Sequence, residues 1–220
     1  MEVRYSFTAQ FIRGGAIFAN HAHNIEGNSL TKSDEASEAE HRSYVVSTVI
    51  QCAAALESEV AEILLHGPGH HLGSNGLDVS ARDFLQPLAE LIDQEPTLHR
   101  YELILHLLRR PALNRGGSPF QSADLLIKLR NELVHYKSKW QEEMERQKLF
   151  ARLKQLRFQK PPFITEDTSF FPHKCLSASL ASWSVNTAVA FITEFYVRLG
   201  IENPIKDYAE RIEVPVPIDC

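Results

Sequence analysis

Residues 130–135 read Arg-Asn-Glu-Leu-Val-His and combine residue types suited to the cleavage of a phosphodiester bond. Histidine titrates near neutral pH, so His135 can act as a general acid or base. Arginine stays charged and presents a planar fork of donors, so Arg130 can stabilise a phosphate whose negative charge grows in the transition state. Asn131 can orient the phosphate or the attacking hydroxyl. These residues are therefore our candidate catalytic group.

The spacing of Arg130 and His135 is poorly suited to a site on one helix. Each helical residue turns by about 100° and rises about 1.5 Å, so positions i and i+5 lie roughly 140° apart around the axis and about 7.5 Å apart along it. A long arginine side chain, or a site completed by a second subunit, would bring both groups to one substrate. Asn131 and His135, at i and i+4, share the polar edge of the helix.

An acidic residue of another helix is the predicted partner of Arg130. On a helical wheel Arg130 lies inside an apolar arc, where an unpaired charge is costly. Glu57 lies in the middle of the apolar stripe of an earlier long helix. We therefore expect Glu57 to face Arg130 where the two helices pack. The alternatives are an ion pair that only sets the register of the helices, or an Arg130 that reaches the rim.

Apolar periodicity predicts an all-α fold that positions these residues. We expect an antiparallel helical bundle at 36–200, an extended N-terminal segment with a loop at 1–35, and an extended C-terminal tail at 201–220. The expected helices cover 36–66, 81–94, 97–110, 119–158 with a bend, and 174–199. Gly14-Gly15 is predicted to form a turn, Ser118-Pro119 to cap the fourth helix, and Gly200 to end the last one.

Composition sets further bounds on the class of protein. The chain has 220 residues, 44% hydrophobic and 23% charged, which suits one sizeable core and argues against general disorder. No apolar run reaches the roughly 18 residues of a membrane span, and the first ten residues lack a signal-peptide layout. The scattered Cys52, Cys175 and Cys220 predict neither a disulfide framework nor a zinc site. A cytoplasmic location is the simplest expectation.

The distribution of charge is uneven. The net charge of −5 argues against general electrostatic binding to nucleic acid, yet residues 128–160 hold ten Lys or Arg against four Glu. That segment is either a phosphate-attracting surface or an ordinary solvated helix of mixed charge. Trp140 is expected in the core, like Trp183, but its lysine neighbours also make it a stacking candidate. The candidate RNA contacts are Lys128, Lys137, Lys139 and Trp140.

Residues 130–135 resemble the signature of the HEPN superfamily, all-α domains marked by an Arg, four to six further residues and a His, commonly with a polar residue after the Arg. The stretch from His41 to Glu57 also looks like the long first helix of such domains, so the resemblance covers about residues 36–200. It implies a metal-independent endoribonuclease without a cofactor, in which a ribose 2′-hydroxyl attacks the adjacent phosphorus and leaves a cyclic phosphate.

The resemblance also implies a homodimer whose two motifs meet in one cleft. Arg130 would stabilise the phosphate charge, Asn131 would position it, and His135 would be the general acid or base. Some members are toxins neutralised by a protein partner that modifies a Tyr two residues after the His. Here that position is Lys137, while Tyr136 directly follows His135, which puts such control in doubt.

Other functions stay open at this point. A non-catalytic dimerisation module, or one that binds RNA or nucleotides, fits the acidic net charge somewhat better than an enzyme that grips RNA broadly. A metal site built from His66, His70 and His71, together with His21 and His23, is the third interpretation. These histidines lie in Gly-rich loops without a recognised ligand spacing, which argues for ordinary exposed side chains and no metal.

Overall fold

The computed structural model describes residues 7–28, 34–66, 77, 79–137, 140, 143, 147–209 and 214. Within them the chain is built from helices, which confirms the predicted all-α class. The α-helices are α1 (Thr8–Asn28), α2 (Glu35–His66), α3 (Val79–Leu85), α4 (Ala89–Asp93), α5 (Thr97–Leu107), α6 (Phe120–Val134), α8 (Lys148–Gln155), α9 (Ala178–Leu199) and α10 (Lys206–Ala209). A 3-10 turn at Gln86–Leu88 separates α3 from α4, and a π-helical turn at Phe170–Lys174 precedes α9.

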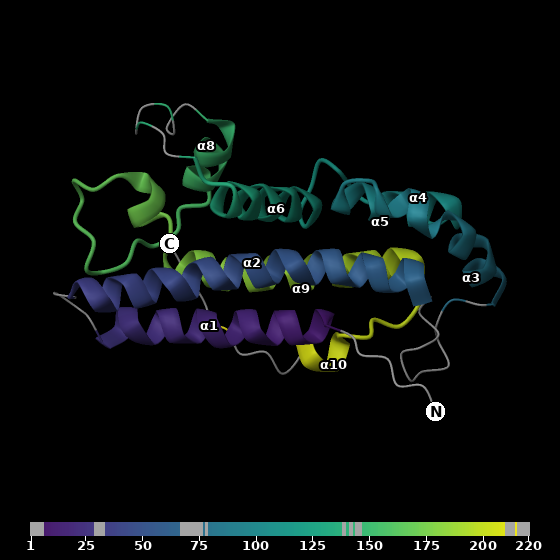
Figure 1. Cartoon of the computed structure of the whole chain (residues 1–220), viewed down its shortest axis with the longest axis horizontal. Coiled ribbons are helices and arrows are strands. Elements are labelled where there is room, and N and C mark those ends of the chain that lie inside the picture. The colour runs from purple at the N-terminus through teal and green to yellow at the C-terminus, as the bar shows by residue number, and fades with distance from the viewer. Residues whose placement is uncertain are drawn as a thin grey trace.

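The three longest helices, α1, α2 and α9, pack against one another, and α2 and α9 form the middle of the molecule (Figure 1). The backbone N–H of Phe7 reaches Glu62 at 3.1 Å, and His41 Nε2 lies 2.9 Å from Glu26 Oε1, so α1 and α2 run antiparallel. α9 begins beside the same Glu26, which accepts the Ala178 N–H at 2.8 Å. Figure 1 shows α5 and α6 covering the α2–α9 layer on the side opposite α1, so the helices stack in three layers.

The prediction of an extended N-terminal segment and loop is wrong for residues 8–28, which form α1. Gly15 makes no turn: a Cβ there would lie 3.0 Å from Cys52 Sγ, and the Thr48 hydroxyl reaches the Gly15 carbonyl at 3.3 Å. Close packing against α2 therefore overrides the turn preference of the two glycines. The buried face of α1 consists of Thr8, Ile12, Gly15, Ala16, Ala19 and Ala22.

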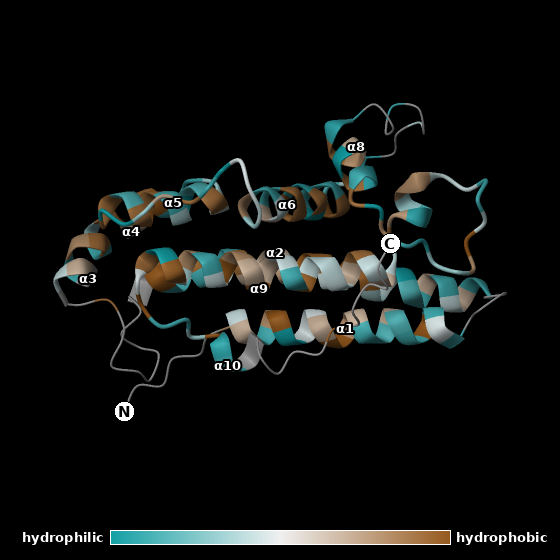
Figure 2. Cartoon of the chain, turned by 180° about the vertical axis from the view of Figure 1, so that it is seen from behind, coloured by the Kyte–Doolittle hydropathy of each residue, from teal (hydrophilic) through white to brown (hydrophobic). Residues whose placement is uncertain are grey.

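Aromatic side chains bind the outer layer to the centre. The buried ring of Tyr101 in α5 lies 5.0 Å from the ring centroid of Phe191 and 4.7 Å from that of Phe195, both in α9. Its hydroxyl donates to the carbonyl of Leu56 in α2 at 2.7 Å. Figure 2 shows more hydrophilic residues toward the end where α1 stops and α2 starts. Among the described residues, no helix has the length and apolar character needed to cross a membrane.

Some helices begin and end where the sequence predicts, and others do not. Gly200 ends α9 as predicted, in the left-handed region at φ 76°. The predicted cap at Ser118 is wrong, because the N-cap of α6 is Pro119 and no side chain caps it. The predicted helix at 81–94 is interrupted by the 3-10 turn that contains Pro87. The helix predicted to reach residue 158 ends at Val134, with α8 as a separate element, and the C-terminal tail contains α10.

Candidate active site

The candidate catalytic residues lie on α6. The apolar side of this helix packs on α2 and α9. Arg130 forms an ion pair with Glu57 of α2, the partner that the helical wheels predict. The Arg130 side chain is 20% exposed and the Glu57 side chain 40% exposed, so the pair lies at the rim of the interface instead of inside the core. The buried residues of α6 are Ala123, Leu125, Leu126 and Leu129.

The buried face of α2 is broader than the predicted apolar stripe, and Glu57 lies at its edge. The helical wheel predicts a stripe of Val46, Ile50, Ala53, Val60 and Leu64, but Ile50 is 36% exposed. Ala53, Val60 and Leu64 are buried as predicted. A second buried stripe, spaced by alternating steps of four and three residues, lies beside them, includes Glu59 and leaves Glu57 at the edge of the buried face. The members of this stripe are Val45, Val49, Cys52, Leu56, Glu59 and Ile63.

His135 is the C-cap of α6, and both His135 and Asn131 are exposed. The N–H of His135 donates to the Asn131 carbonyl at 3.0 Å, while its φ of −108° and ψ of 29° depart from the helix. Within the described part of the chain, no side-chain hydrogen bond joins His135 to Arg130 or Asn131. One copy therefore brings Arg130 and Glu57 together and leaves Asn131 and His135 open to solvent at the end of the same helix.

Aromatic contacts support this end of α6. The ring centroid of Tyr136, the residue after His135, lies 6.2 Å from that of Phe171. Phe171 in turn lies 4.7 Å from Phe150, a buried residue of α8. Tyr136 thus contacts the turn before α9, and that turn packs on α8.

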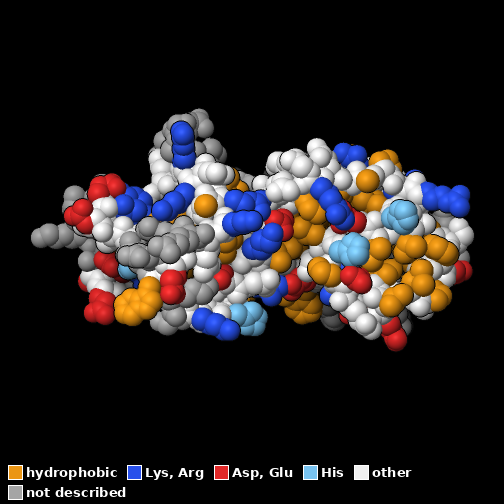
Figure 3. Space-filling model, turned by 90° about the horizontal axis from the view of Figure 1, so that it is seen from above, with side chains coloured by type: hydrophobic (Ala, Val, Ile, Leu, Met, Phe, Trp, Pro, Cys, Tyr) orange, Lys and Arg blue, Asp and Glu red, His pale blue; other side chains and the backbone are white. Residues whose placement is uncertain are grey.

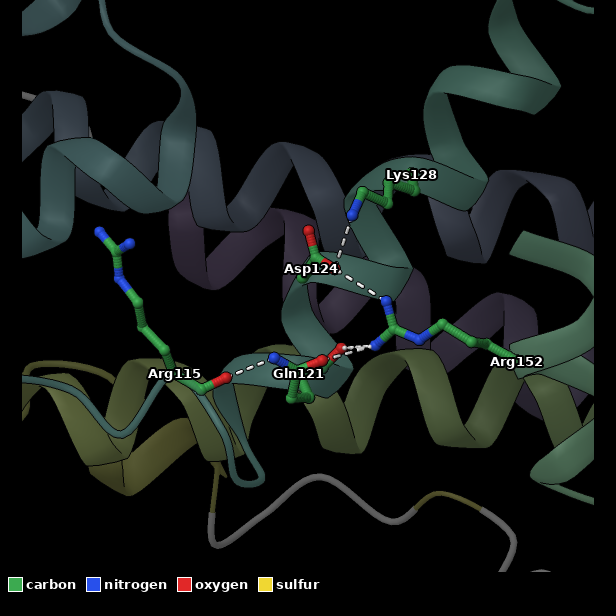
Figure 4. A network of polar contacts seen from close by, with 5 residues as sticks. All are labelled: Arg115, Gln121, Asp124, Lys128 and Arg152. Carbon is green, nitrogen blue, oxygen red and sulfur yellow. Dashed lines mark hydrogen bonds and ion pairs between the residues drawn. The ribbon is translucent and has the colours of Figure 1, made fainter. Parts of the chain in front are cut away.

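A polar network joins α6 to α8, as Figure 4 shows. Asp124 accepts hydrogen bonds from Lys128 Nζ at 2.8 Å and from Arg152 Nη1 at 3.0 Å. Partial burial alone would raise the pKa of Asp124, but the hydrogen bonds from Lys128 and Arg152 outweigh it and lower the pKa. Arg152 also donates to the Gln121 carbonyl at 3.1 Å and to Gln121 Oε1 at 2.9 Å. The network holds the basic helix α8 beside α6.

The candidate RNA contacts differ in their surroundings. Lys128 is paired with Asp124, whereas Lys137 is exposed. Trp140 is 78% exposed, so its prediction as a core residue is wrong and its ring is accessible for stacking. Trp183 is half-buried, with its ring centroid 5.6 Å from that of Phe158. Lys139 lies outside the described residues. Figure 3 shows Lys and Arg side chains gathered over α6 and its surroundings.

Glu59 is a buried carboxylate that the sequence prediction does not include. It is 1% exposed, the Tyr196 hydroxyl donates to its Oε1, and its Oε2 has no hydrogen-bond partner among the described residues. Burial raises the pKa of Glu59 to about 7, although the hydrogen bond from Tyr196 opposes this and the neighbouring Glu62 adds to it. The alternating spacing of Val45 to Ile63 is the sequence signal that would place Glu59 in the core.

The histidines proposed as metal ligands are not assembled by the described structure. His70 and His71 lie outside the described residues, and His21 stacks on Tyr44 with ring centroids 5.0 Å apart. Among the described residues, no group of three or more His, Cys, Asp or Glu side chains is arranged to hold a metal ion.

Comparisons of the chain with protein-family models, with curated proteins and with solved structures give no significant match.

Proposed function

We propose that this protein is a metal-independent endoribonuclease of the HEPN type that acts on RNA in the cytoplasm as a homodimer. The observation that carries the proposal is the Glu57–Arg130 pair at the rim of the α2–α6 interface, with Asn131 and His135 exposed at the end of the same helix. This arrangement offers a phosphate a fixed cation, an amide and an imidazole without a metal ion.

The reaction needs one proton removed and one supplied. His135 accepts the proton of the ribose 2′-hydroxyl, whose oxygen attacks the adjacent phosphorus while the bond to the 5′-oxygen breaks. The partner's His135 returns a proton to that leaving oxygen, and the product keeps a 2′,3′-cyclic phosphate. Arg130 stabilises the charge that develops on the phosphate oxygens. Glu57 is a positioning residue, because it holds the guanidinium at the rim.

Exposed apolar side chains beside the motif support contact with a second copy at this place. The two sequence neighbours of His135 have exposed apolar side chains: Val134 is 50% exposed and Tyr136 is 46% exposed. Contact with a second copy would remove these apolar groups from water, which favours association. Contact between two copies through this region would bring the Arg130 of one copy toward the His135 of the other, which a single helix aligns poorly.

A non-catalytic module that binds RNA or nucleotides is the second candidate. The observation in its favour is that Arg130 is already paired with Glu57 and makes no side-chain hydrogen bond to His135 within the described residues. The net charge of −5 also favours selective binding over a broad grip on RNA.

Cleavage of a panel of single-stranded and structured RNAs in EDTA separates these functions. Wild type is compared with His135→Ala and with His23→Ala, a matched control on the exposed side of α1. We expect His135→Ala to reduce cleavage by about 10²–10⁴-fold and His23→Ala to leave it unchanged. Circular dichroism and light scattering establish first that fold and oligomeric state are the same in all variants.

Two further variants test the ion pair. Arg130→Ala leaves a Glu57 that is 40% exposed and therefore solvated, so the variant should fold and lose cleavage. Glu57→Gln should lower kcat with a smaller change in KM, because it alters the orientation of Arg130 and not the binding of the strand. Absence of cleavage by wild type, or cleavage that persists in folded His135→Ala, would overturn the nuclease and favour the binding module.

A further inference from the structure

A cleft of about 590 Å³ lies between α5 and the loop at 110–116, next to the start of α6. Its volume is within the usual range of small-ligand sites. One face of α5 supplies Glu102, Leu103 and His106, and the loop supplies Arg110, Asn114 and Arg115. This combination of two arginines, an imidazole and an amide beside apolar surface is absent from the sequence prediction, because its members come together only through the loop.

The loop at 110–116, which forms one wall of the cleft, is fixed by its backbone conformation and by hydrogen bonds. Arg109 adopts a left-handed φ of 53°, where glycine is the usual residue. The N–H of Arg109 donates to the His106 carbonyl at 3.0 Å and that of Arg110 to the Leu105 carbonyl at 2.8 Å, which closes the end of α5. Arg198 of α9 donates to the Ala112 carbonyl at 3.1 Å. A wall built in this way loses little conformational freedom when a ligand binds.

The charges in the cleft are only partly neutralised. Arg115 Nε and Nη2 donate to the two oxygens of Glu102 at 2.5 and 2.7 Å, which leaves the other N–H donors of this guanidinium unused. Within the part of the chain that the structure describes, the Arg110 guanidinium has no acidic partner. The cleft therefore presents an unpaired arginine and the free edge of a second one, the donors that recognise a phosphate.

We propose that this cleft binds the phosphate group of a ribonucleotide. Arg110 and Arg115 contact the phosphate oxygens, His106 and Asn114 add hydrogen bonds, and Leu103 packs against the organic part. The nucleotide is either free or part of an RNA strand. The choice of a ribonucleotide over other phosphate esters rests on the proposed nuclease function.

A hydrogen bond connects the loop of the cleft to α6, the helix that carries the candidate catalytic residues. Gln121 Nε2, in the first turn of α6, donates to the Arg115 carbonyl, and Figure 4 shows this bond beside the Asp124 network. The 15 residues of α6 separate the cleft from His135 by about 22 Å. A strand bound in the cleft would thus extend along α6 past Lys128 toward His135.

Calorimetric titration at constant ionic strength tests the site. The ligands are AMP, inorganic phosphate and a 2′-O-methyl oligoribonucleotide, which has no hydroxyl to attack and so reports binding alone. Wild type is compared with Arg110→Ala, Arg110→Lys and Arg13→Ala, a control on an exposed arginine of α1. We expect Arg110→Ala to weaken binding about tenfold or more, Arg110→Lys to weaken it less, and Arg13→Ala to have no effect.

The outcomes separate the sources of the phosphate. Arg110-dependent binding of AMP supports a free nucleotide, and Arg110-dependent binding of the oligonucleotide alone supports a strand. Equal affinity of wild type and folded Arg110→Ala for every ligand, or no binding by wild type, overturns the proposal. Because these ligands are not cleaved, the result is independent of the His135→Ala assay, and either proposal can fail while the other stands.

Discussion

Glu57 and Glu59 stand two positions apart in α2, yet packing gives them different roles. Glu57 keeps 40% of its side chain exposed and pairs with Arg130, and such a rim pair contributes under about 1 kcal/mol to stability. In the proposed mechanism Glu57 instead orients Arg130. Glu59 is buried with one unpartnered oxygen, which makes its charged form costly. The first residue belongs to the candidate chemistry and the second to the pH dependence of folding.

Glu59→Gln should stabilise the protein at alkaline pH. The folded-state pKa of Glu59, raised to about 7 from an ordinary value of 4.5, means that the folded chain holds this proton more tightly than the unfolded chain. The contribution of Glu59 to the free energy of unfolding is therefore fully present below pH 4.5, where the carboxyl is protonated. This contribution falls between pH 4.5 and about 7 and stays low above that range. We expect Glu59→Gln to raise the free energy of unfolding at pH 8 by roughly 1–3 kcal/mol, as measured with urea.

Urea denaturation at pH 5 should show a much smaller difference between Glu59→Gln and wild type, because Glu59 is then protonated in the folded protein. Tyr196→Phe is the complementary variant: it removes the hydroxyl that donates to Glu59 and should destabilise more at pH 8 than at pH 5. A Glu59→Gln effect that is the same at both pH values would contradict a titrating Glu59.

Arg109→Gly should also raise stability. Arg109 holds a φ of 53° after the end of α5, a conformation that costs a non-glycine residue roughly 1–2 kcal/mol. Glycine avoids this cost, but its greater conformational freedom in the unfolded chain cancels part of the gain in stability. We expect a net gain of up to about 1 kcal/mol in urea denaturation. Arg13→Gly, in the middle of α1, should instead lose about 1 kcal/mol. Equal losses in both variants would show that the left-handed conformation at 109 carries no strain.

Among the helices, α6 connects the most parts of the candidate site. It packs on α2 and α9, contacts α8, and begins beside the loop that forms the cleft. The Asp124–Arg152 hydrogen bond links α8 to α6, and α8 also buries the apolar side chains of Phe150 and Leu153. Since exposed ion pairs contribute little and apolar burial contributes more, α8 should keep its helix when the ion pair is lost but open more often.

Asp124→Ala should therefore increase amide exchange in α8 by several-fold, measured by hydrogen–deuterium exchange of residues 148–155, while the buried amides of α9 stay protected. Lys128→Ala serves as the matched variant, because it removes a cation from Asp124 and leaves the Arg152 bond in place. Exchange in α8 that responds equally to both variants, or to neither, would show that the Asp124–Arg152 bond does not hold this helix.

The whole molecule presents its two candidate sites on the layer formed by α5, α6 and α8, away from α1 (Figure 1). Hydrophobic side chains gather over the end formed by α3 to α5 and basic ones over α6 (Figure 3). A homodimer through the carboxyl end of α6 would cover Val134 and Tyr136 and leave the cleft at the other end of α6 open. That geometry suits a strand that passes from the cleft into a shared active site.

Val134→Asp tests the proposed dimer. Light scattering of wild type should give twice the 24.9 kDa mass of one chain, and the new carboxylate should shift the equilibrium toward the monomer because it would be desolvated in the contact. RNA cleavage should fall in parallel. Val197→Asp, at a valine of α9 that is 69% exposed, should change neither property. A wild-type monomer that cleaves RNA would overturn the composite site.

The sequence by itself determined the local features of this protein. Apolar periodicity located α2, α5, α6 and α9, Gly200 ended α9, and the two helical wheels paired Glu57 with Arg130. The helix positions and the end of α9 depend on residues a few positions apart, whose effects on a helix are nearly independent of the rest of the chain. The Glu57–Arg130 pair was predicted from two such local patterns, because a charge within each apolar stripe needs a partner. The residues proposed for catalysis were identified at this level as well.

Only the tertiary structure decided which of these side chains are buried. Close packing of α1 on α2 made a helix of residues that contain two glycines, and the actual core stripe of α2 placed Glu59 inside and Glu57 at the rim. The cleft formed because the loop at 110–116 folds back over α5 and is held by α9. Burial and long-range contacts depend on how several helices fit together, and no single segment contains that information.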